Sequence, residues 1–235
     1  DDLNRIPMSV RPALVRTRDR NILIDAGLGT KLGVKETEMY AIDRTNHLDR
    51  ALAEAGLTAA DIDIVLATHL HFDHAGGNTC LDEDGAPEPA FPNARYFVHR
   101  GEFHYATHTN ERTAASYFPA NWDALVKSGQ IEFVESGRDL VPGIRMRHTP
   151  GHTPDHQSIV IDGDGETGVF LADLCPTAAH IPLPWIMGYD VEPLRTLESK
   201  RALWADALAG GWLLIFEHDA TTAWGRLVEG RKGLE

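Results

Sequence analysis

Thr68-His69-Leu70-His71-Phe72-Asp73-His74 contains three imidazoles and one carboxylate. The apolar run 64–67 directly before it predicts a buried strand, so these polar side chains begin where that strand ends. Imidazole and carboxylate together suit a borderline ion such as zinc. The spacing therefore predicts a metal site at the end of a strand.

The backbone expected here sets the directions of these side chains. In an extended segment, alternate side chains share a face. We therefore expect one face to carry His69, His71 and Asp73. The residues between them, Leu70 and Phe72, would then point into the core.

Two other interpretations of this cluster stay open. The histidines could be unrelated surface or core residues, although their number and spacing beside a strand end argue against this. Four ligands in one loop could also fill a single closed structural zinc site. That site is disfavoured because His74 comes as the chain turns toward Gly76-Gly77, so one tetrahedron would be strained. Neither interpretation explains the polar residues that follow later strands.

The composition indicates an acidic globular protein. The chain has 235 residues, enough for one domain with a sizeable core, and 43% of them are apolar. The formal net charge of -13 argues against nucleic acid or an anionic membrane as a partner, because phosphates would be repelled. Two cysteines, Cys80 and Cys175, are too few for a disulfide framework or a Cys-rich zinc site. No apolar run approaches the ~20 residues of a membrane-spanning helix.

Later strands are also followed by His or Asp. Predicted strands over 144–148, 168–172 and 212–216 lead into His152, Asp173 and Glu217-His218. Helices are predicted over 47–55 and 193–209, so strands and helices alternate and the fold class is α/β. A rigid scaffold of this kind presents ligands from several strand ends at one edge.

A glycine-rich segment suggests a competing function. Gly27, Gly29 and Gly33 follow a predicted strand over 21–25, as in a dinucleotide-binding loop. The third glycine comes one position too late, however, and no amphipathic helix is expected to open there. This interpretation is therefore weaker than a metal site.

The His-x-His-x-Asp-His pattern resembles the signature of the metallo-β-lactamase superfamily, and further matches extend from Asp25 to His218. The resemblance implies a four-layer αββα sandwich of two mixed β-sheets flanked by helices, with the metal site at one edge. One domain over residues 1–235 is expected. The superfamily normally has another strand or two before Val10, so we expect a clipped N-terminus. A cytoplasmic location is expected, with a secreted or periplasmic one left open for the same reason.

The spacing is most similar to the N-acyl-homoserine lactonase and methyl parathion hydrolase branches, which implies a dinuclear site. By this resemblance, the first metal would be bound by His69, His71 and His152. The second would be bound by Asp73, His74 and His218. Asp173 would bridge both, and Asp73 and Asp173 would be the catalytic carboxylates. The cofactors would be two divalent ions, Zn²⁺ before Fe, Mn or Co.

The implied enzyme is a zinc hydrolase in which a metal-bound hydroxide attacks a carboxylic ester or lactone, as in a quorum-quenching lactonase or esterase. The first alternative is an organophosphate triester hydrolase. A mono-iron sulfur dioxygenase and a non-catalytic metal-binding sensor are weaker alternatives, because the second-site ligands are all present. The sequence has no Gly-x-Ser-x-Gly elbow, so no serine nucleophile is expected.

The substrate pocket is expected between the aromatic segment 103–122 and the residues after Asp173. Lactonases usually carry a Tyr three residues after the bridging Asp, where this chain has Pro176, and Tyr189 or His180 could substitute. The candidate substrate-binding residues are Trp185, Met187, Tyr189, His180, Phe103 and Trp122. These aromatics could instead pack the core or a homodimer interface. The expected partner is a small-molecule ester or lactone, with no nucleic acid and no membrane.

Overall fold

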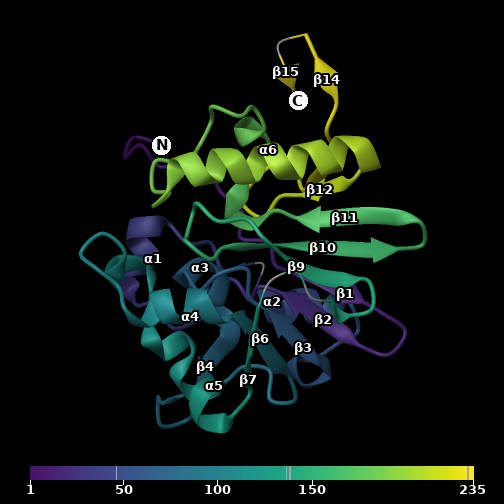
Figure 1. Ribbon diagram of the computed structural model, residues 1–235. Coiled ribbons are helices and arrows are strands. Elements are labelled where there is room, and N and C mark those ends of the chain that lie inside the picture. The colour runs from purple at the N-terminus through teal and green to yellow at the C-terminus, as the bar shows by residue number, and fades with distance from the viewer. Residues whose placement is uncertain (46, 136, 138, 232) are drawn as a thin grey trace. The chain divides into compact units, whose positions relative to one another are not determined.

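The computed structural model describes residues 1–235 except 46, 136, 138 and 232. The chain forms two compact units, here called the N-terminal unit (residues 1–98 and 106–134) and the C-terminal unit (residues 99–105 and 135–235). Each unit contains one mixed β-sheet with helices beside it (Figure 1), which confirms the predicted α/β class with two mixed sheets. A single domain over the whole chain stays a prediction.

The N-terminal unit has a five-stranded sheet in the order β1-β2-β3-β6-β7 and a two-stranded sheet of β4 and β5. Strand β1 is antiparallel to β2, whereas β2, β3 and β6 are parallel. The strands are β1 (Ala13–Arg16), β2 (Asn21–Ile24), β3 (Ile64–Leu66), β4 (Thr79–Leu81), β5 (Pro87–Pro89), β6 (Arg95–His99) and β7 (Ile131–Val134).

The helices of this unit are short. They are α1 (Val34–Tyr40), α2 (Leu48–Glu54), α3 (Phe72–Ala75) and α5 (Asp123–Ser128), and α4 (Arg100–Thr107) contains residues of both units. The 3₁₀ turns are η1 (Ala59–Asp61), η2 (Gly76–Asn78), η3 (Ala114–Ser116) and η4 (Pro119–Asn121). Strand β3 is buried along its whole length, as a parallel strand covered on both faces must be. Its Val65 packs with Leu23 of β2, Tyr96 of β6, Leu52 of α2 and Leu125 of α5.

The C-terminal unit has a six-stranded sheet in the order β13-β12-β11-β10-β9-β8. Strands β11 and β12 are parallel, whereas β8 and β9, β9 and β10, β10 and β11, and β12 and β13 pair antiparallel. The strands are β8 (Asp139–Val141), β9 (Ile144–His148), β10 (Gln157–Gly163), β11 (Glu166–Phe170), β12 (Leu213–Ile215) and β13 (Trp224–Arg226), with a separate hairpin of β14 (Glu229–Gly230) and β15 (Gly233–Leu234). The helical elements are η5 (Ala172–Leu174), η6 (Ala178–His180) and α6 (Pro193–Gly210).

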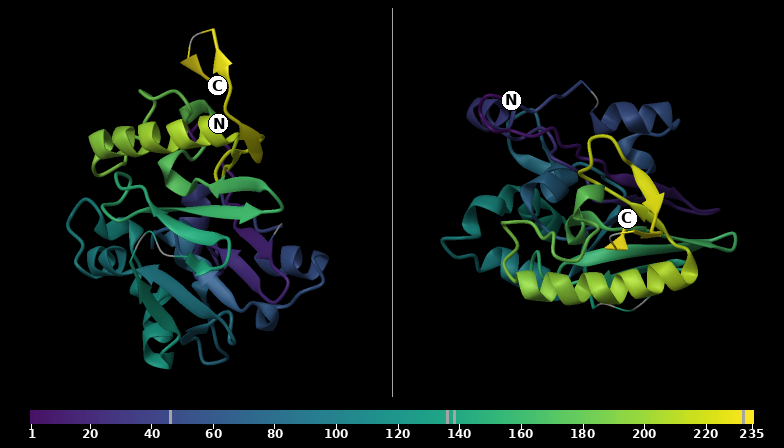
Figure 2. Two further views of the ribbon diagram at one scale, coloured as in Figure 1. Left: turned by 45° about the vertical axis from the view of Figure 1, so that its right-hand side comes forward. Right: turned by 90° about the horizontal axis from the view of Figure 1, so that it is seen from above.

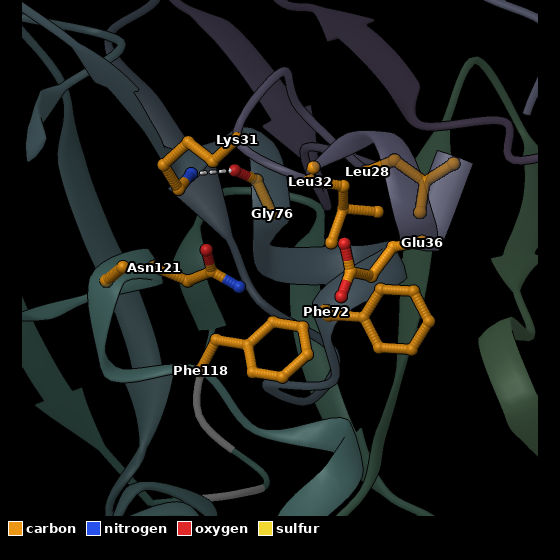
Figure 3. A pocket seen from close by; sticks show the side chains of 10 residues that line it. Leu28, Lys31, Leu32, Glu36, Phe72, Gly76, Phe118 and Asn121 are labelled. Carbon is orange, nitrogen blue, oxygen red and sulfur yellow. Dashed lines mark hydrogen bonds between the residues drawn. The ribbon is translucent and has the colours of Figure 1, made fainter. Parts of the chain in front are cut away.

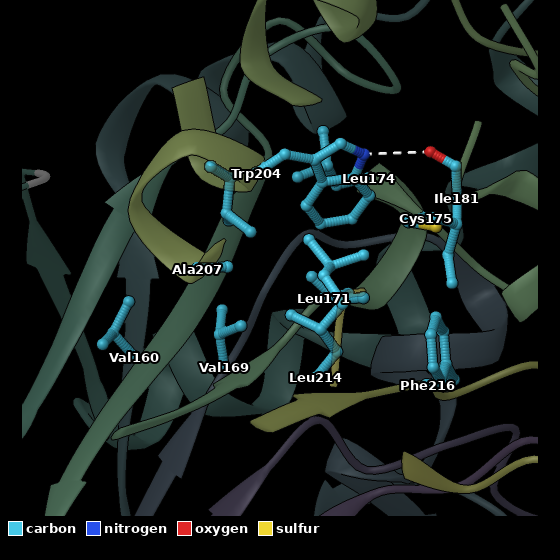
Figure 4. Close-up of a cluster of buried hydrophobic side chains, with 12 residues drawn as sticks. Val160, Val169, Leu171, Leu174, Cys175, Ile181, Trp204, Ala207, Leu214 and Phe216 are labelled. Atoms are coloured by element: carbon cyan, nitrogen blue, oxygen red, sulfur yellow. Dashed lines mark hydrogen bonds between the residues drawn. The ribbon is translucent and has the colours of Figure 1, made fainter. Parts of the chain in front are cut away.

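Helix α6 lies along one face of this sheet (Figures 1 and 2). Leu203, Trp204 and Ala207 pack against strand residues such as Val160 and Val169 (Figure 4). Trp204 is fully buried, and its Nε1–H is satisfied by a hydrogen bond to Ile181 O at 2.9 Å. Among the described residues, the chain has no helix with the length and apolar character needed to cross a bilayer.

The apolar spacing within 193–209 predicts one inner face formed by Leu194, Leu197, Trp204 and Leu208, and this prediction was partly wrong. The spacing predicts Leu194 on that face, yet its side chain is 76% exposed, whereas Lys200 is fully buried. The Lys200 ammonium donates to the carbonyls of His180 at 2.5 Å and of Pro182 and Trp185 at 3.0 Å. Burial lowers the pKa of Lys200. The apolar pattern could not reveal a lysine that is buried because three backbone carbonyls surround it.

Candidate active site

The His-rich loop of the N-terminal unit starts after β3 and ends in α3. The ring centroid of His69 lies 4.6 Å from that of His71 and 4.0 Å from that of His74. His74 Nε2 lies 3.8 Å from Asp73 Oδ2. This unit therefore brings the four predicted ligands of the motif into one cluster.

One part of the predicted geometry was wrong. Helix α3 begins at Phe72, so the chain is helical where extended backbone was expected. Phe72 consequently does not point into the core but is half-buried, stacking 5.4 Å from Tyr40 and lying 5.6 Å from Phe118. Leu70 is buried as predicted.

Asp25, the residue after β2, holds the His-rich loop in place through hydrogen bonds. Its carboxylate accepts hydrogen bonds from Thr68 N at 2.8 Å and Thr68 Oγ1 at 2.7 Å, and lies 3.0 Å from His74 Nδ1. Thr68 Oγ1 in turn lies 3.1 Å from His69 Nδ1. Asp25 is buried and adopts a left-handed φ of 56°, so the backbone is strained to place this carboxylate. Contacts at Nδ1 fix the orientation of an imidazole ring, so that Nε2 of each ring would be the atom that binds a metal ion.

The glycines near β2 have a structural explanation that needs no dinucleotide. A Cβ on Gly29, which has a φ of 61°, would lie 2.3 Å from Gly76 O, and a Cβ on Gly77 would lie 2.1 Å from Ala26 O. The two loops thus touch through their backbones. Helix α1 opens after Gly33, but none of its seven residues is buried, so it has no buried apolar face of the kind that a dinucleotide-binding helix packs on its sheet.

The C-terminal unit brings together the other three predicted ligands. Asp173 Oδ2 lies 2.9 Å from His152 Nε2, and Asp173 Oδ1 lies 3.0 Å from His218 Nε2. All three side chains are buried. Each carboxylate oxygen therefore faces a different imidazole, as a carboxylate between two cations would.

A second carboxylate orients His152. Asp190 Oδ1 lies 2.9 Å from His152 Nδ1, and Asp190 Oδ2 accepts a hydrogen bond from Thr196 Oγ1 at 2.6 Å. Burial alone would lower the pKa of His152, but Asp173 and Asp190 outweigh it and raise that pKa to about 10. The two carboxylates thus make the surroundings of His152 negative, which would also favour a metal cation, and ligation through His152 would require its extra proton to leave.

The donor sets of both units suit zinc. Each contains imidazole nitrogens and carboxylate oxygens, and the buried rings of His74 and His152 each have a carboxylate at Nδ1. Carboxylate–histidine pairs of this kind are usual behind zinc ligands. Both units therefore carry buried His and Asp clusters that are consistent with a dinuclear metal site.

A cavity of about 270 Å³ adjoins the His-rich loop within the N-terminal unit (Figure 3). Its walls are mainly apolar, and polar groups come from Lys31, Glu36 and Asn121. The lining residues are Leu28, Lys31, Leu32, Gly33, Glu36, Phe72, Gly76, Phe118, Ala120 and Asn121. The Lys31 ammonium donates to Gly76 O and, at 2.7 Å, to Thr79 O. Burial lowers the pKa of Lys31 to about 8, against a smaller opposing effect of Cys80.

The candidate substrate-binding residues of the C-terminal unit differ widely in exposure. Trp185 is 64% and Tyr189 52% exposed, and the Tyr189 ring lies edge-on to His152 at 5.9 Å. His180 Nδ1 lies 2.7 Å from Thr177 Oγ1. Met187 and Phe103 are half-buried.

The remaining candidate, Trp122, lies in the N-terminal unit. It is 2% exposed and contacts Tyr117 at 6.5 Å. Its indole is part of the packed interior, which agrees with the alternative that some of these aromatics are core residues. At the position where lactonases usually carry Tyr, Pro176 is buried and its carbonyl accepts from His218 N at 3.1 Å.

Several residues near the candidate ligands and the cavity were not named as candidates. Asp190 and Lys200 lie in or beside α6, and Asn121 lines the cavity. Phe118 also lines the cavity, but it belongs to the aromatic segment 103–122 that was expected to border the substrate pocket. None of them follows a strand end, which was the signal used for the ligands. The burial of Lys200 could have been recognised from the helical spacing, which places this lysine on the inner face of α6.

The family follows from comparison with known sequences. The model described as "Metallo-beta-lactamase superfamily" matches residues 7–224, so the chain belongs to this superfamily. An N-acyl homoserine lactonase from Bacillus sp is 30% identical over 168 residues, covering 67% of this chain and 60% of that protein. The chain thus spans about 60% of the length of the curated relatives it matches. The predicted resemblance is confirmed.

Solved structures agree with this assignment. A probable metal-dependent hydrolase from Staphylococcus aureus superposes with a TM-score of 0.86 at 32% identity, covering 93% of this chain and 77% of that one. AidC, a dizinc quorum-quenching lactonase solved with a product, gives a TM-score of 0.79 at 23% identity, covering 97% and 78%. At that identity the likeness shows the fold alone.

Proposed function

We propose that the chain is a dinuclear metal-dependent hydrolase of carboxylic esters or lactones. In this proposal the ligands of the two units bind one pair of divalent ions, with Zn²⁺ as the first choice. His69, His71 and His152 would hold one ion. Asp73, His74 and His218 would hold the other, and Asp173 would bridge them.

The geometry of Asp173 carries the proposal. Its two oxygens lie 2.9 and 3.0 Å from the Nε2 atoms of His152 and His218. A carboxylate that served one ion only would not need an imidazole at each oxygen. The N-terminal unit supplies two further pairs, because the ligand atoms of His69 and His71 lie within 4.8 Å of one another, as do those of Asp73 and His74.

The chemistry divides between the ions and the chain. When bound, two divalent ions supply an activated water at neutral pH and polarise the scissile carbonyl. Asp25 and Asp190 keep the rings of His74 and His152 in a fixed orientation. Holding the ligands rigidly in this way removes reorganisation from the reaction.

The cavity supports a substrate with an apolar chain. Leu28, Leu32, Phe72 and Phe118 provide apolar walls, and Phe72 lies in the motif between two ligands. Each methylene that such walls remove from water stabilises the complex by about 0.8 kcal/mol. The Bacillus relatives are named N-acyl homoserine lactonases, so an acylated lactone is the substrate class we propose.

Metal analysis together with a substrate panel tests this function. The panel contains N-acyl homoserine lactones of several chain lengths, aryl esters, phosphotriesters and glutathione thioesters. We expect two zinc ions per chain and turnover of the lactones. Phosphotriester turnover without lactone turnover would move the assignment to the first alternative. One iron per chain with consumption of oxygen would overturn the proposal.

A pair of histidine variants of the N-terminal unit provides the control. His69→Ala removes a proposed ligand and should lower both metal content and lactone turnover. His47→Ala changes a residue that caps α2 at Asp49 N, and both quantities should stay at the wild-type level.

A further inference from the structure

Ala172 is the residue that turns the chain out of β11 and into Asp173. Its φ is 46°, in the left-handed region that a residue with a Cβ rarely adopts. Its side chain is fully buried. The carboxylate of Asp173 follows directly, so its position depends on whether this strained peptide keeps its conformation.

Four hydrogen bonds join the two sides of Ala172. Asp173 N–H donates to His156 Nε2 at 3.2 Å, and His156 Nδ1 lies 2.9 Å from Thr149 Oγ1. Thr149 Oγ1 lies 3.1 Å from Ser158 Oγ, which donates to Leu171 O at 3.1 Å. The chain of bonds therefore starts at the peptide after Ala172 and returns to the peptide before it.

The directions of these bonds are mutually consistent. Ser158 gives its one hydroxyl proton to Leu171 O, so its oxygen accepts from Thr149. Thr149 Oγ1 then accepts from His156, whose proton must lie on Nδ1 because Nε2 already accepts from Asp173. All three side chains are at most 1% exposed. In a buried circuit of this kind each bond fixes the next.

We propose that His156 is a positioning residue, which holds Ala172 in its left-handed conformation and thereby aims both oxygens of Asp173. The metal-binding role of Asp173 in this proposal rests on the proposed function. His156 acts as a neutral imidazole with its proton on Nδ1. Its ring also lies edge-on to His152 at 6.0 Å, so it contacts two of the three ligands of the C-terminal unit.

The test compares single and double variants of the full chain. His156→Gln should raise the rate of hydrogen exchange at the Asp173 amide in the metal-free protein and weaken cobalt(II) binding at least tenfold. The absorption of the cobalt-loaded protein should change, and kcat should fall with little change in KM. Replacing Ala172 by Gly removes the strain, so the His156→Gln/Ala172→Gly variant should regain most of the cobalt affinity.

Two further variants guard the interpretation. Thr149→Val breaks the circuit without changing the shape of the side chain, so it should cause the same faster exchange and weaker cobalt binding as His156→Gln. It also keeps the test decisive if His156→Gln fails to fold. His148→Gln changes a more exposed histidine of the same unit, which lies 3.2 Å from Asp155, and should leave every readout unchanged.

The readouts separate this proposal from the proposed function. Nitrogen chemical shifts of His156 in the metal-free chain should show the tautomer protonated at Nδ1. Wild-type exchange at Asp173 and wild-type cobalt affinity in His156→Gln and Thr149→Val would overturn the positioning role. A double variant as weak as His156→Gln would also overturn it. Absence of lactone turnover with the expected shifts, exchange and cobalt binding would instead count only against the proposed function.

Discussion

Asp190 Oδ1 lies 2.9 Å from His152 Nδ1, and both side chains are buried. Asp190 is fixed in turn by Thr196 in the first turns of α6. The backbone adds two links, because Val191 N donates to His152 O at 3.2 Å and Glu192 N donates to Gly151 O at 2.9 Å. The orientation of one predicted metal ligand is therefore set by the start of the longest helix.

Asp190→Asn should weaken zinc binding about 10- to 100-fold, because a neutral amide supports the imidazole less well than a carboxylate. Competition with a chromogenic chelator measures the affinity. Glu192→Gln is the control, since its carboxylate pairs with Arg195 at 2.6 Å on a partly exposed surface. Equal affinity in Asp190→Asn and wild type would contradict the role of Asp190.

Asp173→Ala should abolish binding of the metal pair, since it removes the one carboxylate that faces both His152 and His218. Metal content per chain, measured by mass spectrometry, checks this. Asp164→Ala, in the turn between β10 and β11, should leave the content unchanged. A variant that keeps two metals and full activity would remove the bridge from this account.

Phe118→Ala should weaken binding of long-chain substrates, because it removes an apolar wall of the cavity beside Phe72. We expect KM for a decanoyl lactone to rise about tenfold, which corresponds to about 1.4 kcal/mol of binding free energy, and KM for a butanoyl lactone to rise less. Steady-state kinetics on the two substrates give the comparison. Equal changes in both KM values would mean that this cavity does not hold the acyl chain.

Trp185→Ala tests the other predicted substrate surface. Its side chain is 64% exposed while its carbonyl is held by Lys200, so the change should remove apolar contact without loosening the backbone. We expect KM to rise more for long acyl chains than for short ones. If Phe118→Ala shows this selectivity and Trp185→Ala does not, the acyl chain of the substrate binds in the cavity and does not contact Trp185.

Lys31 should make stability depend on pH. Its pKa falls from 10.5 to about 8 on folding, chiefly through burial. Between about pH 8 and 10.5 the unfolded chain binds more protons at this residue, so the free energy of unfolding should rise with pH, by at most about 1.4 kcal/mol per unit. Below pH 8 this contribution is constant.

Urea denaturation at several pH values tests this dependence. Lys31→Met should lose that rise relative to wild type, whereas Lys127→Met, on an exposed position of α5, should keep it. Parallel curves for wild type and Lys31→Met from pH 8 to 10.5 would show that Lys31 does not titrate on unfolding in this window.

The sequence could single out the candidate ligands because their signal is local. Each predicted ligand is a His or Asp shortly after an apolar strand, and the structure clusters them within each unit. The strands and helix α6 could be predicted for the same reason, since burial imposes a regular spacing on adjacent residues.

The errors arose where tertiary contacts override spacing. Phe72 lies outside the core, contrary to prediction, because helix α3 starts there. Lys200 is buried because three carbonyls surround its ammonium. His156 and Asp190 contact predicted ligands across 17 and 38 residues of sequence. Such contacts leave no periodic signal in a single sequence.

The backbone contact between Gly29 and Gly76 bears on attempts to change the substrate preference of the proposed hydrolase by directed evolution. Both positions border or adjoin the cavity, yet any side chain there would collide with the opposite loop before it could meet a substrate. Libraries that vary Leu28, Leu32 and Phe118 and leave the glycines alone should therefore yield more folded clones with altered chain-length preference.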